Sequence, residues 1–303
     1  MIVAAIDIGT NSTRLLVAAV NDGVITKELY RQSVITRLGR GVNGAGRLSA
    51  PAVERTLEVL RDYAKIAGAR QADAIRAVAT SAMRDAGNAA DLLVPAVEIL
   101  NVMPEIIAGE DEAALTYKGV LADEDTRALG PKFLVIDIGG GSTEIILGDD
   151  QGPKRLRSLP LGCVRLTEAF FTADPPPPGE ITALRLNVRR SLDDNFSHAV
   201  GAGAVPIAVA GTPTSLAAIE LKLAVYDRDK VHRYKLSRDT VARQLEMLAS
   251  LPLAGRKEIV GLEPDRADVI ISGAAILLEI MTFFKFDYVL VSERDILDGV
   301  ALS

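Results

Sequence analysis

Aromatic residues are scarce in this chain: they make up 4% of its 303 residues, and tryptophan is absent. Proteins that bind single-stranded nucleic acids stack the bases on aromatic rings, so this composition argues against such a partner. The net charge of −6 also gives the surface as a whole no attraction for polyanions. We therefore expect no nucleic-acid partner, and we expect any anionic ligand to be held locally by arginines and a metal ion.

Cysteine and long apolar runs are also nearly missing. The single cysteine, Cys163, excludes an internal disulfide and suits a reducing cytosol. The first residues lack a basic segment and reach Asp7 at once, unlike a signal peptide. The longest apolar stretch, near residues 269–278, is too short to span a bilayer. The sequence therefore predicts a cytoplasmic protein without a membrane partner.

What the chain does contain is a central glycine-rich turn between two apolar runs, within residues 135–147. Its three glycines, 139–141, would let backbone N–H groups approach a ligand closely and form a concavity that binds anions. Asp137 precedes the turn and Glu144 follows it. Because two carboxylates repel a bare phosphate, a divalent cation is the natural mediator. The alternative is a tight hairpin with two solvated acids.

A second copy of this stretch lies near the N-terminus. Without a gap, the matching residues are Ile6, Asp7, Ile8, Gly9, Ser12 and Thr13 against Ile136, Asp137, Ile138, Gly139, Ser142 and Thr143. A repeat at half the chain length indicates two copies of one domain. We expect two phosphate loops that face each other in a cleft between similar domains, an interpretation that the repeat favours over the hairpin.

The expected secondary structure repeats as well. Each half begins with three strands rich in valine and isoleucine and continues with alternating helices and strands. The order βββαβαβα gives an α/β domain with a mixed sheet. The expected strands are residues 2–8, 12–20, 24–34, 74–79 and 105–108, then 132–138, 143–148, 154–160, 205–210 and 288–291. One expected helix follows Ser49, which can cap it, and another opens at Gly109. Further helices are expected at residues 164–171, 180–199, 237–248, 265–284 and 293–302. The glycine-rich residues 37–47 are expected to form a loop.

A polar, turn-forming segment at residues 123–131 links the halves. It predicts an N-terminal domain of residues 1–124 and a C-terminal domain of residues 125–303. The last helix, residues 293–302, could pack back on the first domain.

Motifs from one end of the chain to the other resemble one family. They occupy residues 6–14, 37–39, 79–86, 107–113, 135–144, 161–168, 210–212 and 291–292, with Gly299. Together they are similar to the exopolyphosphatase / guanosine pentaphosphate phosphatase family, within the acetate-kinase, sugar-kinase, Hsp70 and actin superfamily. The resemblance implies two ribonuclease-H-like domains with a ligand cleft between them, and a homodimer. Two departures stand out: residues 293–298 carry acids where relatives often have glycine and arginine, and the chain stops before the helical HD-type domain of long members.

The resemblance also implies hydrolysis of a phosphoanhydride bond, which needs a positioned water and neutralised phosphate oxygens. It places the catalytic glutamate at Glu112; the alternative is that Glu110, Asp111 and Glu112 merely complement a helix N-terminus. The candidates for holding Mg²⁺, or Mn²⁺, are Asp7, Asp137 and Glu144, since Mg²⁺ commonly combines one or two carboxylates with water and substrate oxygens.

Phosphate binding is assigned to both loops and to one arginine. Arg84 is expected to contact a phosphate, because a guanidinium matches phosphate oxygens, although it could be an ordinary surface arginine. Arg14 and Arg165 are weaker candidates, and Arg165 could instead pair with Glu168. The remaining assigned residues are Thr10, Asn11, Ser12, Gly139, Gly140, Gly141, Ser142 and Thr143.

The predicted function is an exopolyphosphatase that releases terminal orthophosphate from inorganic polyphosphate and favours short chains. The alternative with the same chemistry is a phosphatase that converts pppGpp to ppGpp. Alternatives of another class are a small-molecule kinase and a non-enzymatic nucleotide switch of the same superfamily. The kinase hypothesis leaves the family match at Glu112 unexplained.

Overall fold

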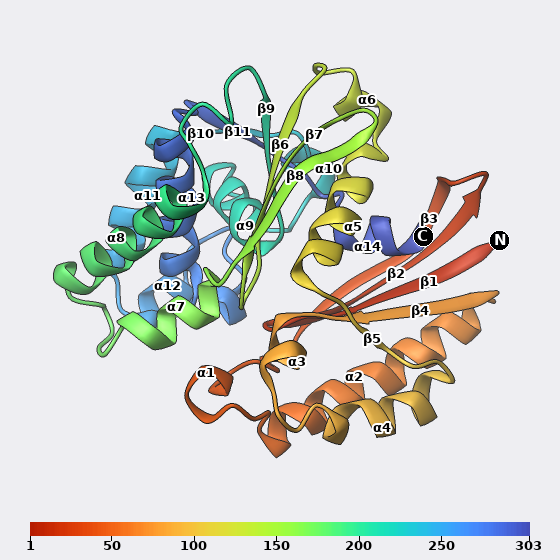
Figure 1. Ribbon diagram of the computed structural model, residues 1–303. Helices are drawn as coiled ribbons and strands as arrows, with labels where there is room; N and C mark the ends of the chain where they lie inside the picture. Colours follow the sequence, from red (N-terminus) through yellow and green to blue (C-terminus); the bar gives the residue numbers. More distant parts are fainter. The chain divides into compact units, whose positions relative to one another are not determined.

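The computed structural model describes residues 1–303 and divides into two compact units, each built on one mixed sheet (Figure 1). The first unit comprises Met1–Arg127 with Arg294–Ser303, and the second comprises Ala128–Glu293. The division that we expected after residue 124 falls after the short helix α6 (Glu124–Arg127).

The sheet of the first unit has the strand order β3-β2-β1-β4-β5. β1, β2 and β3 are antiparallel neighbours because tight turns join them, whereas β4 and β5 run parallel to β1 because helices connect them. This mixed sheet confirms the α/β fold class. The strands are β1 (Ile2–Ile8), β2 (Ser12–Asn21), β3 (Val24–Ile35), β4 (Ala74–Ala79) and β5 (Glu105–Ile106).

Helices cover both faces of this sheet, because alternate residues of a strand point to opposite faces. On one face, Ile6 and Ile8 of β1 share a core with Leu57 of α2 and Leu92 of α4. On the other face, Ala5 and its neighbours pack with α14 and α5. The helices are α1 (Val42–Ala45), α2 (Ala50–Ala69), α3 (Ser81–Asp85), α4 (Ala90–Leu100), α5 (Gly109–Leu121) and α14 (Ile296–Ala301).

The sheet of the second unit repeats this arrangement and has the strand order β10-β11-β9-β6-β7-β8. β6 pairs with β7 antiparallel and with β9 parallel, as β1 pairs with β2 and β4. The extra edge strand β10 pairs antiparallel with β11. The strands are β6 (Phe133–Ile138), β7 (Thr143–Asp149), β8 (Gly152–Leu159), β9 (Val205–Val209), β10 (Lys235–Ser237) and β11 (Tyr288–Val291).

The helices of the second unit gather around α13, which is apolar and buried along nearly its whole length. α8 and α11 both pack against it (Figure 1). No helix of the protein combines the length and the apolar character needed to cross a membrane. The helices are α7 (Cys163–Phe170), α8 (Pro178–Asn195), α9 (Gly211–Glu220), α10 (Arg228–Val231), α11 (Arg238–Ser250), α12 (Leu253–Lys257) and α13 (Ile270–Phe284), with a 3-10 turn at Pro264–Arg266.

Several expected boundaries differ from the structure. Ser49 does precede α2, but its side chain makes no capping hydrogen bond. The helix expected from residue 265 begins at Ile270, and the last helix begins at Ile296 rather than at residue 293. The later start of α14 has a clear cause: Asp295 and Asp298 form a capping box that fixes where the helix opens.

Candidate phosphate-binding and catalytic residues

The site residues predicted for the first unit lie where neighbouring parallel strands end. The first loop (residues 9–12) follows β1, Arg84 follows β4, and Glu112 follows β5. Backbone hydrogen bonds hold these segments together, from Thr80 N to Ile8 O at 3.2 Å and from Ile107 N to Ala79 O at 3.1 Å. The carboxyl ends of parallel strands are the usual place for ligands in open α/β sheets.

The second loop (residues 139–142) directs its N–H groups away from helix α7. Its carbonyl groups accept bonds from α7: Cys163 N to Gly139 O at 3.0 Å, Val164 N to Gly140 O at 2.9 Å, and Arg165 Nε to Gly141 O at 2.7 Å. In a trans peptide the C=O and N–H bonds point in opposite directions. The N–H groups of Gly140, Gly141 and Ser142 therefore point to the side opposite α7, in the row that the sequence predicts.

The first loop is held in the same way by residues 36–39. Gly39 N donates to Thr10 O at 2.8 Å, and Thr36 N donates to Asn11 O at 3.0 Å. By the same geometry, the N–H groups of Asn11 and Ser12 point away from this segment. Both loops thus present successive N–H groups on one side, which is the arrangement that binds anions.

Two threonine hydroxyls predicted to face phosphate also have partners within the fold. Thr10 Oγ1 accepts a hydrogen bond from Ala82 N at 3.2 Å, which leaves its own proton available. Thr143 is fully buried, and its hydroxyl donates to Leu161 O at 2.5 Å. The Thr143 hydroxyl proton is therefore used in a hydrogen bond within the unit, and this bond stabilises the second loop.

The acids beside the second loop occupy opposite positions on two adjacent strands. Asp137 of β6 lies directly opposite Glu144 of β7, so their side chains share one face of the sheet. Both residues are buried, at 6% and 1% exposure, and Glu144 accepts a hydrogen bond from Ser158 Oγ at 2.7 Å. Buried carboxylates placed side by side favour a cation between them.

The corresponding pair in the first unit combines an acid with a base. Asp7 of β1 lies opposite Arg14 of β2, and Arg14 donates from Nη2 at 2.8 Å and from Nε at 3.0 Å to Asp7 Oδ2. Asp7 Oδ1 is buried and has no hydrogen-bond partner. Arg14, a weak candidate for phosphate binding, is therefore bound to carboxylates in this structure.

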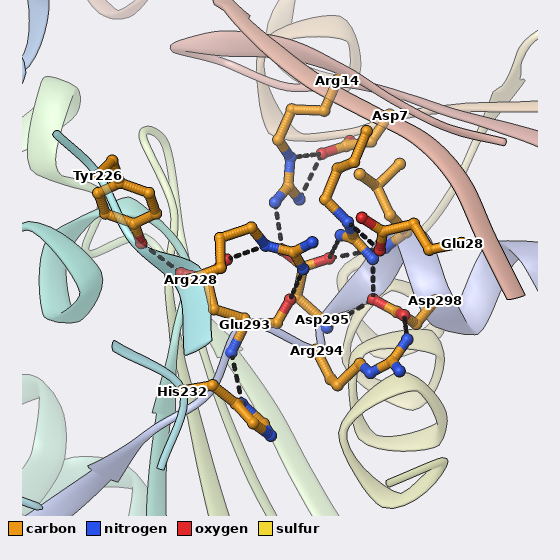
Figure 2. A network of polar contacts seen from close by, with 12 residues as sticks. Asp7, Arg14, Glu28, Tyr226, Arg228, His232, Glu293, Arg294, Asp295 and Asp298 are labelled. Atoms are coloured by element: carbon orange, nitrogen blue, oxygen red, sulfur yellow. Dashed lines mark hydrogen bonds and ion pairs between the residues drawn. The ribbon is translucent and has the colours of Figure 1, made fainter. Parts of the chain in front are cut away.

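A chain of ion pairs continues from Arg14 to the C-terminal helix (Figure 2). Arg14 Nη1 binds Asp295, and Arg31 Nη2 binds Asp298 Oδ2 at 2.9 Å. Burial raises the pKa of the Asp7 carboxyl, although Arg14 acts to lower it. Burial also acts to raise the pKa of Asp295, but Arg14 and Arg31 outweigh it and hold that pKa below its ordinary value.

The predicted catalytic glutamate lies beside the predicted phosphate-binding arginine. Glu112 is in the first turn of α5, and its Oε2 accepts a hydrogen bond from Arg84 Nη1 at 2.8 Å. The same Arg84 nitrogen donates to Ile107 O at 2.9 Å, which anchors the guanidinium to the backbone. Arg84 thus fixes the orientation of the Glu112 carboxylate.

The residues that could hold a metal ion are carboxylates beside the two loops. No three His, Cys, Asp or Glu side chains are grouped as metal ligands. Mg²⁺ needs fewer, because one or two carboxylates suffice when water and substrate oxygens complete the coordination. The opposed Asp137 and Glu144 and the unpartnered Asp7 Oδ1 fit that requirement.

Two kinds of residue escaped the sequence analysis. Gly39 and Gly162 lie against the loops, and the repeated Leu-Gly pair in residues 38–39 and 161–162 was a signal for them. Asp295 was noted only as a departure from related sequences, and sequence alone gave no sign that it binds Arg14. Cys163 is buried, and burial raises the pKa of its thiol to about 11, as suits a small apolar residue.

Comparison with known proteins gives one consistent result. A model of the Ppx/GppA phosphatase family matches residues 16–303. Exopolyphosphatase 2 of Mycobacterium tuberculosis is 36% identical over 99% of this chain and 98% of its own length. The solved structure of an exopolyphosphatase-like protein has a TM-score of 0.93 and 31% identity, covering 99% of this chain and 96% of the other. The Aquifex aeolicus PPX-GPPA enzyme has a TM-score of 0.83 and 32% identity, covering 100% of this chain and 99% of its own.

Proposed function

This chain belongs to the Ppx/GppA phosphatase family, a family of phosphoanhydride hydrolases, and we propose that it is a metal-dependent exopolyphosphatase. In this proposal, the enzyme removes the terminal phosphate of inorganic polyphosphate as orthophosphate. A relative of similar length, named an exopolyphosphatase, supports the choice of substrate.

The observation that carries the proposal is the second loop with its paired acids. Its N–H groups, at Gly140, Gly141 and Ser142, point to one side and can donate to the oxygens of a phosphate group. Asp137 and Glu144 flank the loop at opposed positions of β6 and β7. A site that combines N–H donors with paired carboxylates suits a phosphate that carries a divalent cation.

Glu112 is proposed as the residue that orients the attacking water and accepts its proton. The water oxygen forms a bond to the terminal phosphorus, the bond from that phosphorus to the bridging oxygen breaks, and the bridging oxygen stays with the shortened chain. Arg84 keeps the Glu112 carboxylate in a single orientation through its hydrogen bond. Each loop, within its own unit, offers N–H groups that can donate to phosphate oxygens.

Asp137 and Glu144 would hold Mg²⁺ or Mn²⁺ in the second unit, and Asp7 offers one buried carboxylate oxygen in the first. Such an ion, when bound, neutralises phosphate oxygens and so lowers the barrier to attack.

A preference for short chains is part of the proposal. The net charge of −6 provides no long-range attraction for a long polyanion. Arg14 and Arg84 are bound to carboxylates, which limits the positive charge available near the first loop. The enzyme should therefore grip few phosphate units at a time and release its substrate between cleavages.

Orthophosphate release should be assayed side by side from tripolyphosphate, long polyphosphate, pppGpp and ATP, with Mg²⁺ present. We expect the highest kcat/KM with tripolyphosphate, and a gradually shortening ladder when long polyphosphate is partly digested. Faster hydrolysis of pppGpp would replace the proposal with the alternative phosphatase. If partly digested long polyphosphate contains only intact chains and final products, without chains of intermediate length, the enzyme is processive. That result would refute the short-chain preference.

A further inference from the structure

We propose that Gly39 and Gly162 are positioning residues, which keep the two phosphate loops in the conformation that presents their N–H groups. Each lies in a short segment that donates hydrogen bonds to the carbonyl groups of one loop. We call residues 36–39 the first clasp and residues 161–165 the second clasp. This inference rests on the proposed function, because it concerns how the same loops bind phosphate.

At Gly162, the second clasp approaches only backbone atoms of its loop. A Cβ atom added at Gly162 would lie 2.1 Å from Gly140 O and 2.3 Å from the carbonyl carbons of Gly140 and Gly141. No side chain can move to relieve these contacts, since every atom involved belongs to the backbone. Any residue other than glycine at position 162 must therefore move the backbone of the loop and of the clasp apart.

At Gly39, the first clasp lies close to a side chain of its loop. A Cβ atom added at Gly39 would lie 2.3 Å from Thr10 Cγ2 and 3.1 Å from Ala82 Cβ. The shorter of these contacts depends on one methyl group, which serine lacks. Alanine at position 39 should therefore be tolerated better once Thr10 is shortened to serine, because the remaining contacts, 3.1 Å to Ala82 Cβ and 3.3 Å to Thr10 Cβ, need only small shifts.

The two contacts are equivalent in the internal repeat. Thr10 and Gly140 occupy the same position of the two loops, and each is the residue that its clasp glycine approaches. The carbonyl oxygens at these positions accept bonds from Gly39 N and from Val164 N, at 2.8 and 2.9 Å. A buried leucine, Leu38 or Leu161, precedes each glycine. The clasp thus belongs to the duplicated unit together with the loop.

The clasps matter for function because they set the direction of the loop N–H groups. Each clasp donates to loop carbonyls, and the planar peptide then directs the next N–H group to the opposite side. Donors that are fixed before the substrate binds need no reorganisation during the reaction. A displacement of about 1 Å at such donors can lower the rate about 10²-fold.

The proposal is tested with Gly162→Ala and Gly39→Ala, each alone, and with Gly39→Ala combined with Thr10→Ser. Gly179→Ala and Gly68→Ala are the matched controls, because a Cβ atom at either position meets nothing within 4 Å. Each variant is checked for kcat and KM with tripolyphosphate, for tripolyphosphate binding by calorimetry, and for amide hydrogen exchange in residues 139–142 and 9–12.

We expect Gly162→Ala to lower kcat/KM about 10²-fold, weaken tripolyphosphate binding and speed exchange in residues 139–142. Gly39→Ala should act in the same way on residues 9–12, and adding Thr10→Ser should bring the double variant back to the level of Thr10→Ser alone. The controls should behave as the wild type does.

Unchanged exchange and binding in Gly162→Ala would overturn the proposal, as would a failure of Thr10→Ser to rescue Gly39→Ala. Loop exchange is measured without substrate, so it separates this inference from the proposed function. If the wild type hydrolyses no polyphosphate while the exchange results hold, the function fails and the clasps stand as loop supports.

Discussion

The two phosphate loops share a backbone arrangement but differ in the charges beside them. In both, the carbonyl groups bind a clasp and the N–H groups point the other way. In the first unit, Asp7 faces Arg14 across the strands, whereas in the second, Asp137 faces Glu144. One exchange of arginine for glutamate at equivalent positions therefore changes a neutralised acid into a carboxylate pair that suits a cation.

In the first unit, a candidate acid is paired with an arginine at two places. Arg14 binds Asp7, and Arg84 binds Glu112, so both of its candidate acids have an arginine as partner. An ion pair fixes the orientation of a carboxylate, and the arginine acts to lower its pKa, although burial outweighs this effect at Asp7. Under the proposed function, the first unit would orient the candidate catalytic groups and the second would bind the cation.

We expect the largest loss of turnover from a substitution of Glu112. Glu112→Gln keeps the size of the side chain but cannot accept a proton, so turnover should fall about 10²-fold or more while tripolyphosphate still binds. Glu110→Gln is the matched control, since Glu110 is an exposed neighbour on the same helix turn. Turnover near the wild-type rate in a folded Glu112→Gln protein would remove Glu112 from its role.

A second prediction concerns the ion pairs of the first unit. Asp295→Asn removes the buried carboxylate that Arg14 and Arg31 share, although each keeps its pair with Asp7 or Asp298, and should lower the free energy of unfolding by about 3 kcal/mol. Asp62→Asn, which breaks an exposed pair with Lys65, should change it by less than about 1 kcal/mol. Urea denaturation at pH 7 measures both.

The pH dependence of this effect follows from the direction of the pKa shift. Because the folded protein holds the pKa of Asp295 below its ordinary value, its contribution is present above about pH 4 and is lost as the pH falls further. The difference between wild type and Asp295→Asn should therefore shrink in acid. A difference that grows below pH 4 would contradict the assignment.

The smallest expected effect uses Cys163 as a reporter of the second clasp. Since burial raises its pKa to about 11, only about 10⁻³ of the thiol is ionised at pH 8, and alkylation by iodoacetamide should be slow. Gly162→Ala should speed alkylation by loosening the clasp, and Gly39→Ala should leave it unchanged. Equal rates in wild type and Gly162→Ala, measured by mass spectrometry, would show that the clasp stays closed.

The sequence predicted the features that repeat in register. The six matched residues of each loop revealed the duplication, and the mixed sheet expected from the order βββαβαβα is found in both units. The three-residue strand β10 escaped notice because so short a segment has no periodicity of its own. The clasps escaped because Gly39 and Gly162 lie at different distances from their loops along the chain.

The ion pairs could not be predicted, for a different physical reason. Arg14 and Asp295 lie at opposite ends of the chain, and they meet because α14 packs on the sheet that contains Arg14. Likewise, the contact between Arg84 and Glu112 depends on β4 and β5 being neighbours. Such pairs follow from the tertiary fold and not from the local pattern.

The most direct test of the account is the metal dependence of hydrolysis in three proteins: wild type, Asp137→Asn and Asp7→Asn. Orthophosphate release from tripolyphosphate is measured after treatment with EDTA and during titration with Mg²⁺. We expect the chelator to abolish activity and Mg²⁺ or Mn²⁺ to restore it. Asp137→Asn should raise the Mg²⁺ concentration at half-maximal rate about tenfold or more, and Asp7→Asn by less, because Asp7 already has Arg14 as its partner. Activity that is indifferent to the chelator, or a larger shift in Asp7→Asn than in Asp137→Asn, would contradict the account.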